Sequence, residues 1–365
     1  MRGDAAVQVR PATVEDAKGI AAVRARNGMP SFDIEDWRQS WESHPFRDEF
    51  AETPFGWVLE NGREGIVGTL SNIPMMYDLD GKPVRASASG AWAVDSPHRR
   101  SSLLLMSALL RQKGVDLHII GSANTVASPI MTGLKLPRIP APDFNVSLLW
   151  VTGYRGFATS VLRKKNIPAA SWLGMPAGAA LGAYDCLKGR VGRRRVEVRQ
   201  YDSFTEDFDI FWNELRRRPA GRLRAARTSA ALRWRFRQSL RTGKLAILGL
   251  TDSQGALSGY CIALEQQREH IGLKQYLVAD LQSLDDAPGT LLELLEAAID
   301  LSRRRGIHLV EWQGGNRAKR YVALSLRPRP YLYPSWPAFY RLFRADLGAA
   351  LENEATWDLL PIDVY

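Results

Sequence analysis

Residues 91–112, AWAVDSPHRRSSLLLMSALLRQ, contain a short polar joint that carries His98, Arg99 and Arg100. The apolar residues before the joint are typical of a strand, and those after it are typical of a helix. The first turn of a helix presents unpaired backbone N–H groups and the positive end of the helix dipole, an arrangement that suits phosphate. This stretch alone fits either a phosphate-binding joint or a solvated corner between a strand and a helix.

The elements around the joint form a simple order. The chain opens with a strand and a helix capped by Thr13, and turns at 61–62 and 80–81 then separate three apolar strands. The joint, its helix, a further strand, a loop containing Asn124 and a short helix follow. The predicted order is therefore strand, helix, three strands, helix, strand and helix.

The second half of the chain repeats this order with a period of about 170 residues. Gly, Pro and Ala cluster between the two halves. We predict a first domain at 1–151, a linker segment at 152–196 and a second domain at 197–365. Within the linker segment, the small-residue stretch 168–187 is interpreted as a linker or packed helix, with contact to a membrane surface as the alternative.

Composition narrows the class of protein. A chain of 365 residues favours two cores, because single cores stop growing at about 250 to 300 residues. Two cysteines and the lack of an apolar run after the first charges favour a cytoplasmic setting without a signal peptide. The net charge is +10, and residues 188–241 hold 16 Lys or Arg against 6 Asp or Glu. Such a segment attracts phosphate, nucleic acid or anionic lipid, or is a solvated helix face.

The chain resembles the GNAT acyltransferase superfamily. The residues that carry the resemblance are VRPATVEDAKGIAAV, WVLENGREGIVGTL, VDSPHRRSS and GSANTVASPIMTGLKL. Roughly residues 5–145 carry most of it, and the second half matches mainly in element order. The resemblance implies an α/β (α+β) fold of two GNAT-like domains, each a mixed, mostly antiparallel sheet flanked by helices. It also implies acyl-coenzyme A as co-substrate.

The resemblance further implies which residues hold the coenzyme. Backbone and side chains at Arg99, Arg100, Ser101 and Ser102 correspond to the pyrophosphate-binding joint, with the amides of 100–104 as directional donors. The backbone N–H of Val94 would polarise the thioester carbonyl, and Asn124 would touch the pantetheine or serve only as a turn residue.

The joint departs from the family pattern, which has glycines where this chain has Arg100, Ser102 and Leu104. The corresponding joint in the second half departs further, because Asp285 and Asp286 would repel a pyrophosphate. We therefore expect a coenzyme site only in the first half.

Candidate acid–base groups lie beside the ends of the predicted strands. Asp95 and His98 are candidate bases, with a turn former and a surface histidine as their structural alternatives, and Asp280 is a further candidate in the second half. Tyr340 and Tyr331 are candidate acids for the leaving thiolate, although dense aromatic residues are usually core. The spacing of the five histidines and two cysteines gives no support for a metal site.

Three functions remain open at this stage. The first is an acyl-coenzyme A-dependent N-acyltransferase acting on an amine of a small molecule, amino sugar or lipid-linked acceptor. The second is a Fem-like aminoacyl-tRNA-dependent transferase, favoured by the missing glycines and the basic segment, although the sequence shows no long helical hairpin of the kind such enzymes often carry. The third is a non-catalytic binding protein that keeps the tandem fold, because fold alone does not establish activity.

Overall fold

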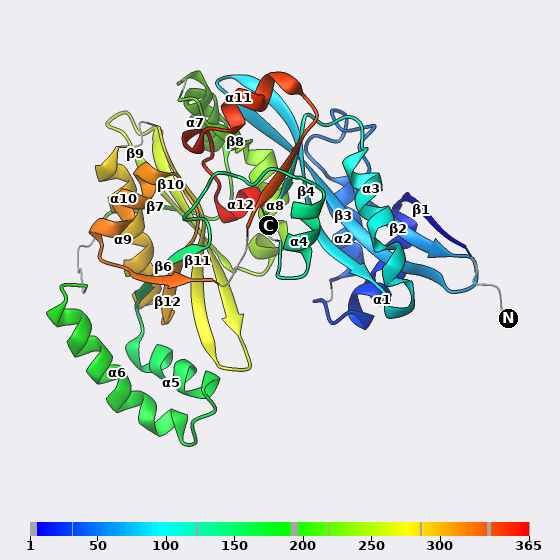
Figure 1. Cartoon of the computed structure of the whole chain (residues 1–365). Helices are drawn as coiled ribbons and strands as arrows, with labels where there is room; N and C mark the ends of the chain where they lie inside the picture. The colour runs from blue at the N-terminus through cyan, green and yellow to red at the C-terminus, as the bar shows by residue number, and fades with distance from the viewer. Residues whose placement is uncertain are drawn as a thin grey trace.

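The computed structural model describes residues 6–30, 32–121, 123–190, 196–218, 220–284, 287–333 and 337–364. Its two sheets lie side by side, with helices around both (Figure 1). Almost all strand pairs are antiparallel, and one pair in each sheet, β4 with β5 and β11 with β12, is parallel. The predicted fold of two mixed, mostly antiparallel sheets flanked by helices is confirmed.

The first sheet has the order β1-β2-β3-β4-β5-β14, and β8 pairs with the far end of β3. Its strands are β1 (Val7–Pro11), β2 (Gly56–Asn61), β3 (Gly65–Leu79), β4 (Lys82–Val94), β5 (Leu117–Ile120), β8 (Leu223–Ala225) and β14 (Phe339–Leu342). The second sheet has the order β13-β6-β12-β11-β10-β9-β7. Its strands are β6 (Val146–Val151), β7 (Arg199–Tyr201), β9 (Leu245–Thr251), β10 (Leu257–Arg268), β11 (Leu273–Ser283), β12 (Leu309–Trp312) and β13 (Arg329–Leu332).

The helices cover these sheets with their apolar faces. In the first half they are α1 (Ala17–Arg26), α2 (Ile34–Glu42), α3 (Ser102–Leu110) and α4 (Ala127–Gly133), with 3-10 turns at Val14–Asp16 and Ser96–Ser101. After them come α5 (Tyr154–Lys164), α6 (Ala170–Leu187), α7 (Glu206–Arg217), α8 (Ser229–Arg241), α9 (Pro288–Arg304) and α10 (Arg317–Ser325). The chain ends in short turns at Ala345–Leu347, α11 (Gly348–Leu351), Glu354–Thr356 and α12 (Pro361–Val364).

Hydrophobic cores pack against both sheets. Leu105, Met106 and Leu109 of α3 pack on the first sheet against Trp57 and Leu59. The larger core lies between the second sheet and α7, α8 and α9, with aromatic residues such as Phe208 and Phe211 of α7 at its centre. Burial of this much apolar surface is the main source of stability for such sheets.

Both sheets take strands from the far side of the predicted domain boundaries: the first sheet takes β8 and β14, and the second takes β6. β6 lies before residue 151, yet it pairs with β12 and β13 in the second sheet. β14 lies in the C-terminal part of the chain, yet it pairs with β5 in the first sheet. The two halves are therefore linked by exchanged strands as well as by the connecting segment.

The segment predicted as a linker contains a helical hairpin. Helices α5 and α6 pack along each other and extend away from both sheets, in green in Figure 1. Of the two interpretations of 168–187, a linker or a packed helix, the structure shows a helix, because the glycines of α6 let it lie close against α5. Residues 191–195, at the end of the predicted linker, lie outside the described residues.

Candidate functional site

A cleft opens in the first sheet where its two parallel strands separate. β4 and β5 pair only at Ala86–Ala88 with Leu117–Ile119. Beyond these pairs the space between the strands forms a cavity of about 510 Å³. Its walls come from β4, β5, the end of α1, α3 and α4, and the lining residues are Asn27, Met29, Leu70, Ser89, Gly90, Ala91, Trp92, Ala93, Val94, Arg99, Ser102, Met106, Ile120, Asn124, Val126, Ala127, Ile130 and Met131.

A β-bulge in β4 shapes one wall of this cleft. Ser71 pairs with Gly90 and Thr69 with Ala93, so Ala91 and Trp92 together face Leu70 alone. Ala91 has φ +43°, in the left-handed region that a residue with a Cβ rarely adopts. Indole Nε1 of Trp92 is buried and has no hydrogen-bond partner among the described residues. The bulge therefore places the strained residue Ala91 and the side chain of Trp92 in the cleft wall.

The backbone alternation of β4 indicates where the Val94 amide points. The N–H of Asp95 donates to the Val67 carbonyl of β3 at 2.9 Å. Because successive N–H groups of a strand point to opposite sides, the N–H of Val94 points away from β3, toward the opened side of the sheet. This is the orientation that a carbonyl bound in the cleft would need.

The joint after β4 is a 3-10 helix, Ser96–Ser101, that runs directly into α3. Arg99, Ser102 and Met106, spaced as neighbours on one helix face, line the cleft, whereas Arg100 and Ser101 do not. The N–H of Ser102 donates to the Arg99 carbonyl. The Ser102 amide is thus bonded within the joint, and the binding of a pyrophosphate by the amides of 100–104 stays a prediction.

Leu104 of α3 and Asn124 of the loop before α4 differ in their position relative to the cleft. Leu104, which stands where the family has a small residue, is 47% exposed on α3 and does not line the cleft. Asn124 does line it, and its Oδ1 accepts the N–H groups of Val126 (3.0 Å) and Ala127 (2.9 Å) at the start of α4. Its Nδ2 is then the part of the side chain that can donate to a ligand.

The structure does not bring the candidate bases Asp95 and His98 to the cleft wall. Arg26 donates to Asp95 at 2.6 Å and Asn27 at 3.0 Å, so this carboxylate attaches α1 to the joint. His98 Nε2 lies 3.2 Å from Glu64 Oε2 on the surface. Both side chains have structural partners here.

The candidates from the second half also lie elsewhere. Asp280 is fully buried and accepts hydrogen bonds from Arg227 (2.9 Å), Tyr260 (2.7 Å) and Gln282 (3.0 Å). Tyr340 is buried in the core on the other face of the first sheet, where burial raises the pKa of its hydroxyl. Tyr331 lies on β13 of the second sheet and packs on the ring of Tyr333. None of the three lines the cleft.

Several solved structures are similar to this chain over most of its length. Among solved structures, yeast (Saccharomyces cerevisiae) N-myristoyltransferase with bound myristoyl-CoA and inhibitors aligns over 93% of this chain and 80% of its own, at 10% identity and a TM-score of 0.58. An Enterococcus faecalis protein of unknown function, described as a probable N-acyltransferase, aligns over 93% and 73% at 10% identity and a TM-score of 0.56. A GCN5-related N-acetyltransferase from Kribbella flavida aligns over 93% and 73% at 15% identity and a TM-score of 0.53. The chain has the tandem GNAT fold. No family model and no curated protein sequence matches it.

In the second half of this tandem GNAT fold, two buried ion-pair networks lie at the end of β11. Lys319 donates to Asp358 at 2.6 Å and to Gln282 at 3.0 Å, and all three are buried. Arg227 connects Asp280 to Asp363 of the C-terminal turn. The second half also has a cavity of about 480 Å³ against β11 and β12, lined by residues such as Leu277, Ala279 and Gln313. Asp285 and Asp286, on which the sequence argument rested, lie outside the described residues.

The arginines of the basic segment mostly serve internal contacts of the tandem GNAT fold. Arg227 is fully buried, Arg216 pairs with Asp78 of β3 at 2.8 Å, and Arg237 lies 3.4 Å from Asp36 of α2. The pairs of Arg216 and Arg237 join the second half of the chain to the first half. Arg227 joins β11 to the C-terminal turn within the second half. Because these arginines bind carboxylates of the same chain, the basic segment gives less support to a tRNA-dependent transferase than its charge alone indicates.

A buried polar network next to the cleft escaped the sequence analysis. Ser87 Oγ lies 2.7 Å from His118 Nδ1, across the β4–β5 pairing, and Gln112 donates to Ser87 at 3.2 Å. Burial lowers the pKa of His118 to about 3, so the ring is neutral near pH 7. Ser89 and Ile120, two residues further along the same strands, line the cleft. Alternation of apolar and polar residues in ASASG is the only sequence signal for Ser87, and it does not identify a partner.

Proposed function

We propose that this protein is an acyl-coenzyme A-dependent N-acyltransferase that binds its co-substrate in the cleft between β4 and β5. The observation that carries the proposal is the separation of these parallel strands into a cavity of about 510 Å³ whose wall includes Val94, Arg99, Ser102 and Asn124. These four residues are among those that the resemblance in sequence predicts for a coenzyme site. The acceptor in this proposal is an amine of a small molecule, amino sugar or lipid-linked compound.

The chemistry of the lining fits the parts of an acyl-coenzyme A. Arg99 is the one charged side chain among the described residues of the lining, and it stands at the joint where a pyrophosphate would lie. The N–H of Val94, which points away from β3, is a donor for the thioester oxygen of the arm. Leu70, Met106, Ile120, Ile130 and Met131 offer an apolar surface.

In the transfer itself, the acceptor nitrogen attacks the thioester carbonyl carbon, the C–S bond breaks and the thiolate leaves. No described residue of the lining is a carboxylate or a histidine. We therefore propose that the amine enters in its neutral form and that its proton leaves to water. The rate should then rise with pH along the ionisation of the acceptor amine.

Equilibrium titration of the full chain with acetyl-coenzyme A and longer acyl-coenzyme A compounds tests binding. Release of free thiol in the presence of a panel of amines tests transfer. We expect saturable binding and amine-dependent thiol release. Lack of binding at millimolar ligand would overturn the proposal, and binding without thiol release for any amine would favour the non-catalytic alternative.

A further inference from the structure

The α5–α6 hairpin exposes an unusual share of large apolar side chains. Trp172 is 84% exposed and Leu187 is 87% exposed, at opposite ends of α6. None of the described helices combines the length and apolarity needed to cross a bilayer. The exposed large apolar residues of the hairpin are Val161, Trp172, Leu173, Met175, Tyr184 and Leu187.

The packing of the two helices explains this exposure. α6 turns glycines toward α5: a Cβ on Gly174 would lie 1.9 Å from Thr159 Oγ1, and one on Gly178 would lie 2.9 Å from the backbone of Arg155. The large side chains of α6 are thus left on the side away from α5. A typical surface helix of a globular protein has the opposite arrangement, with its large apolar residues inside and charged residues outside. The outer face of α6 is therefore an apolar face without a partner in the described chain.

The charges around this face are almost all positive. Residues 144–190 contain six Lys or Arg and a single acidic residue, Asp185. Asp185 is buried and bonded to Arg190 and Arg329, so it presents no free negative charge. Lys164 and Lys165 are exposed at the turn between the helices, and Lys188 is exposed at the far end of α6. An apolar face between two basic ends is typical of helices that lie in the interface of an anionic membrane.

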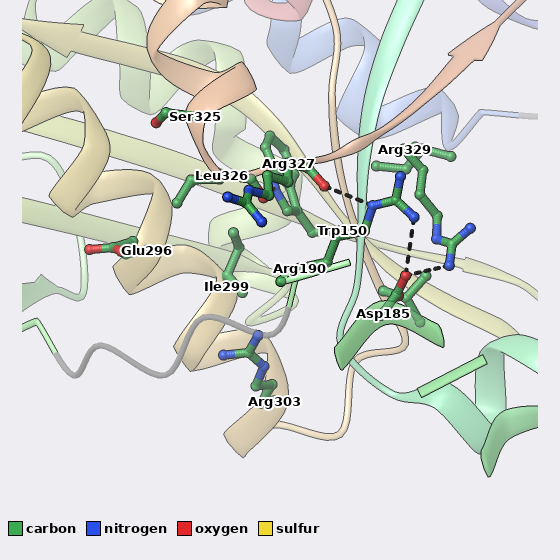
Figure 2. A pocket seen from close by; sticks show the side chains of 13 residues that line it. Trp150, Asp185, Arg190, Glu296, Ile299, Arg303, Ser325, Leu326, Arg327 and Arg329 are labelled. Atoms are coloured by element: carbon green, nitrogen blue, oxygen red, sulfur yellow. Dashed lines mark hydrogen bonds and ion pairs between the residues drawn. The ribbon is translucent and has the colours of Figure 1, made fainter. Parts of the chain in front are cut away.

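A cationic cavity continues this pattern at the base of the hairpin. Its volume is about 180 Å³, and Figure 2 shows Arg190, Arg303, Arg327 and Arg329 around it together with Asp185 and Glu296. Four guanidinium groups face two carboxylates, which leaves an excess of two positive charges. This excess lies where the hairpin joins the second sheet, beside the same end of α6 that carries Lys188.

We propose that the α5–α6 hairpin docks the protein on the surface of an anionic lipid bilayer. The outer face of α6 enters the boundary between headgroups and acyl chains, and the basic side chains at both ends, continued by the cationic cavity, contact the lipid phosphates. The sign of the charge selects an anionic bilayer over a neutral one. This inference does not depend on the proposed transferase activity.

Flotation of the full chain with lipid vesicles tests the inference. We expect binding to vesicles of phosphatidylcholine and phosphatidylglycerol in equal parts, much weaker binding to phosphatidylcholine alone, and loss of binding at high salt. The double variant Trp172→Ser with Leu173→Ser should weaken partition at least about tenfold, because two exposed apolar side chains are lost. Tyr321→Ser, which changes an equally exposed side chain (80%) on α10, is the matched control.

Charge is tested separately. Lys164→Glu with Lys165→Glu should weaken partition at least about 25-fold, since each basic residue near an anionic surface contributes roughly fivefold. Lys18→Glu, an exposed lysine of α1, should bind as the wild type does. Absence of binding to anionic vesicles, or hairpin variants that bind like their controls, would overturn the inference. A solution dimer that Trp172→Ser dissociates would also overturn it and assign the face to a second copy of the chain.

Discussion

Reversal of the charge at Arg99 tests how the joint holds a coenzyme. Arg99 is the one charged side chain among the described residues that line the cleft. The N–H of the neighbouring Ser102 is already bonded to the Arg99 carbonyl. A hydrogen bond to a charged group is worth about 1.5 to 3 kcal/mol. Arg99→Glu should therefore weaken acyl-coenzyme A binding by about 1.5 to 3 kcal/mol, which is roughly 10- to 150-fold in the dissociation constant.

The assay is isothermal titration with acetyl-coenzyme A at fixed ionic strength. Arg100→Glu makes the same charge change one residue away, outside the cleft lining, and should cost clearly less. Arg303→Glu, on α9 of the second half, should change the affinity little. Thermal unfolding of Arg99→Glu and Arg100→Glu should match the wild type, because exposed side chains at a corner make few packing contacts.

The pattern of the three affinities decides between explanations. A loss confined to Arg99→Glu supports recognition by a side chain inside the cleft. Equal losses at Arg99 and Arg100 would mean that the joint acts only through its overall charge. If all three variants bound coenzyme like the wild type, the joint would be a solvated corner and the reasoning about this site would be refuted.

Three further predictions follow from strain and burial. Ala91→Val should cost about 1 to 2 kcal/mol in urea unfolding and weaken coenzyme binding, because a β-branched residue fits the left-handed region poorly; Ala91→Gly should preserve both. Arg227→Met should destabilise the protein by about 3 to 5 kcal/mol in urea unfolding, since it leaves two buried carboxylates without their cation, whereas Arg217→Met at the surface should cost less than about 0.5 kcal/mol. Burial lowers the pKa of His44 to about 4 and that of His118 to about 3, so the unfolded chain takes up protons first as the pH falls below about 6.5. Between pH 6.5 and 5 each histidine should reduce the free energy of unfolding by about 2 kcal/mol, and His44→Leu should give a shallower pH dependence in denaturant titrations.

Local patterns in the sequence were sufficient to predict the elements that position the cleft. The turns at 61–62 and 80–81 and the apolar strands beside them give the β2-β3-β4 meander, and the joint with its apolar helix gives α3. Four residues named for a coenzyme site line one cavity as a result. Their chemical roles stay predictions, because the structure shows where they lie and not what they bind.

The detailed geometry of the joint could not be predicted from the family pattern. Pro97 stands in the first turn with its φ already suited to a helix, and the residues after it are not glycines. The backbone therefore forms a 3-10 helix, and its carbonyls accept hydrogen bonds from amides such as that of Ser102. The family pattern gives the position of the joint, but its hydrogen bonds depend on Arg100 and Ser102, which stand where the family has glycines.

The arginines of residues 188–241 show a second kind of limit. Their charge is visible in the sequence, but their partners are not, because Asp36 and Asp78 lie well over a hundred residues before them. Asp363 lies a similar distance after Arg227, and burial raises the pKa of this carboxyl to about 6. Whether a run of arginines faces solvent or the interior depends on such distant carboxylates, so composition alone favoured a binding surface that the structure uses for internal contacts.

The exchanged strands make each sheet depend on residues from both halves of the chain. β5 has β4 on one side and the late strand β14 on the other, so the last part of the chain completes the sheet that forms the cleft. β6, from the first half, lies between β12 and β13 in the second sheet. Removal of either exchanged strand would expose unpaired backbone groups along a sheet edge, which is costly and favours aggregation. The cleft in the first half therefore depends on the second half for its own sheet, which gives the second half a structural role.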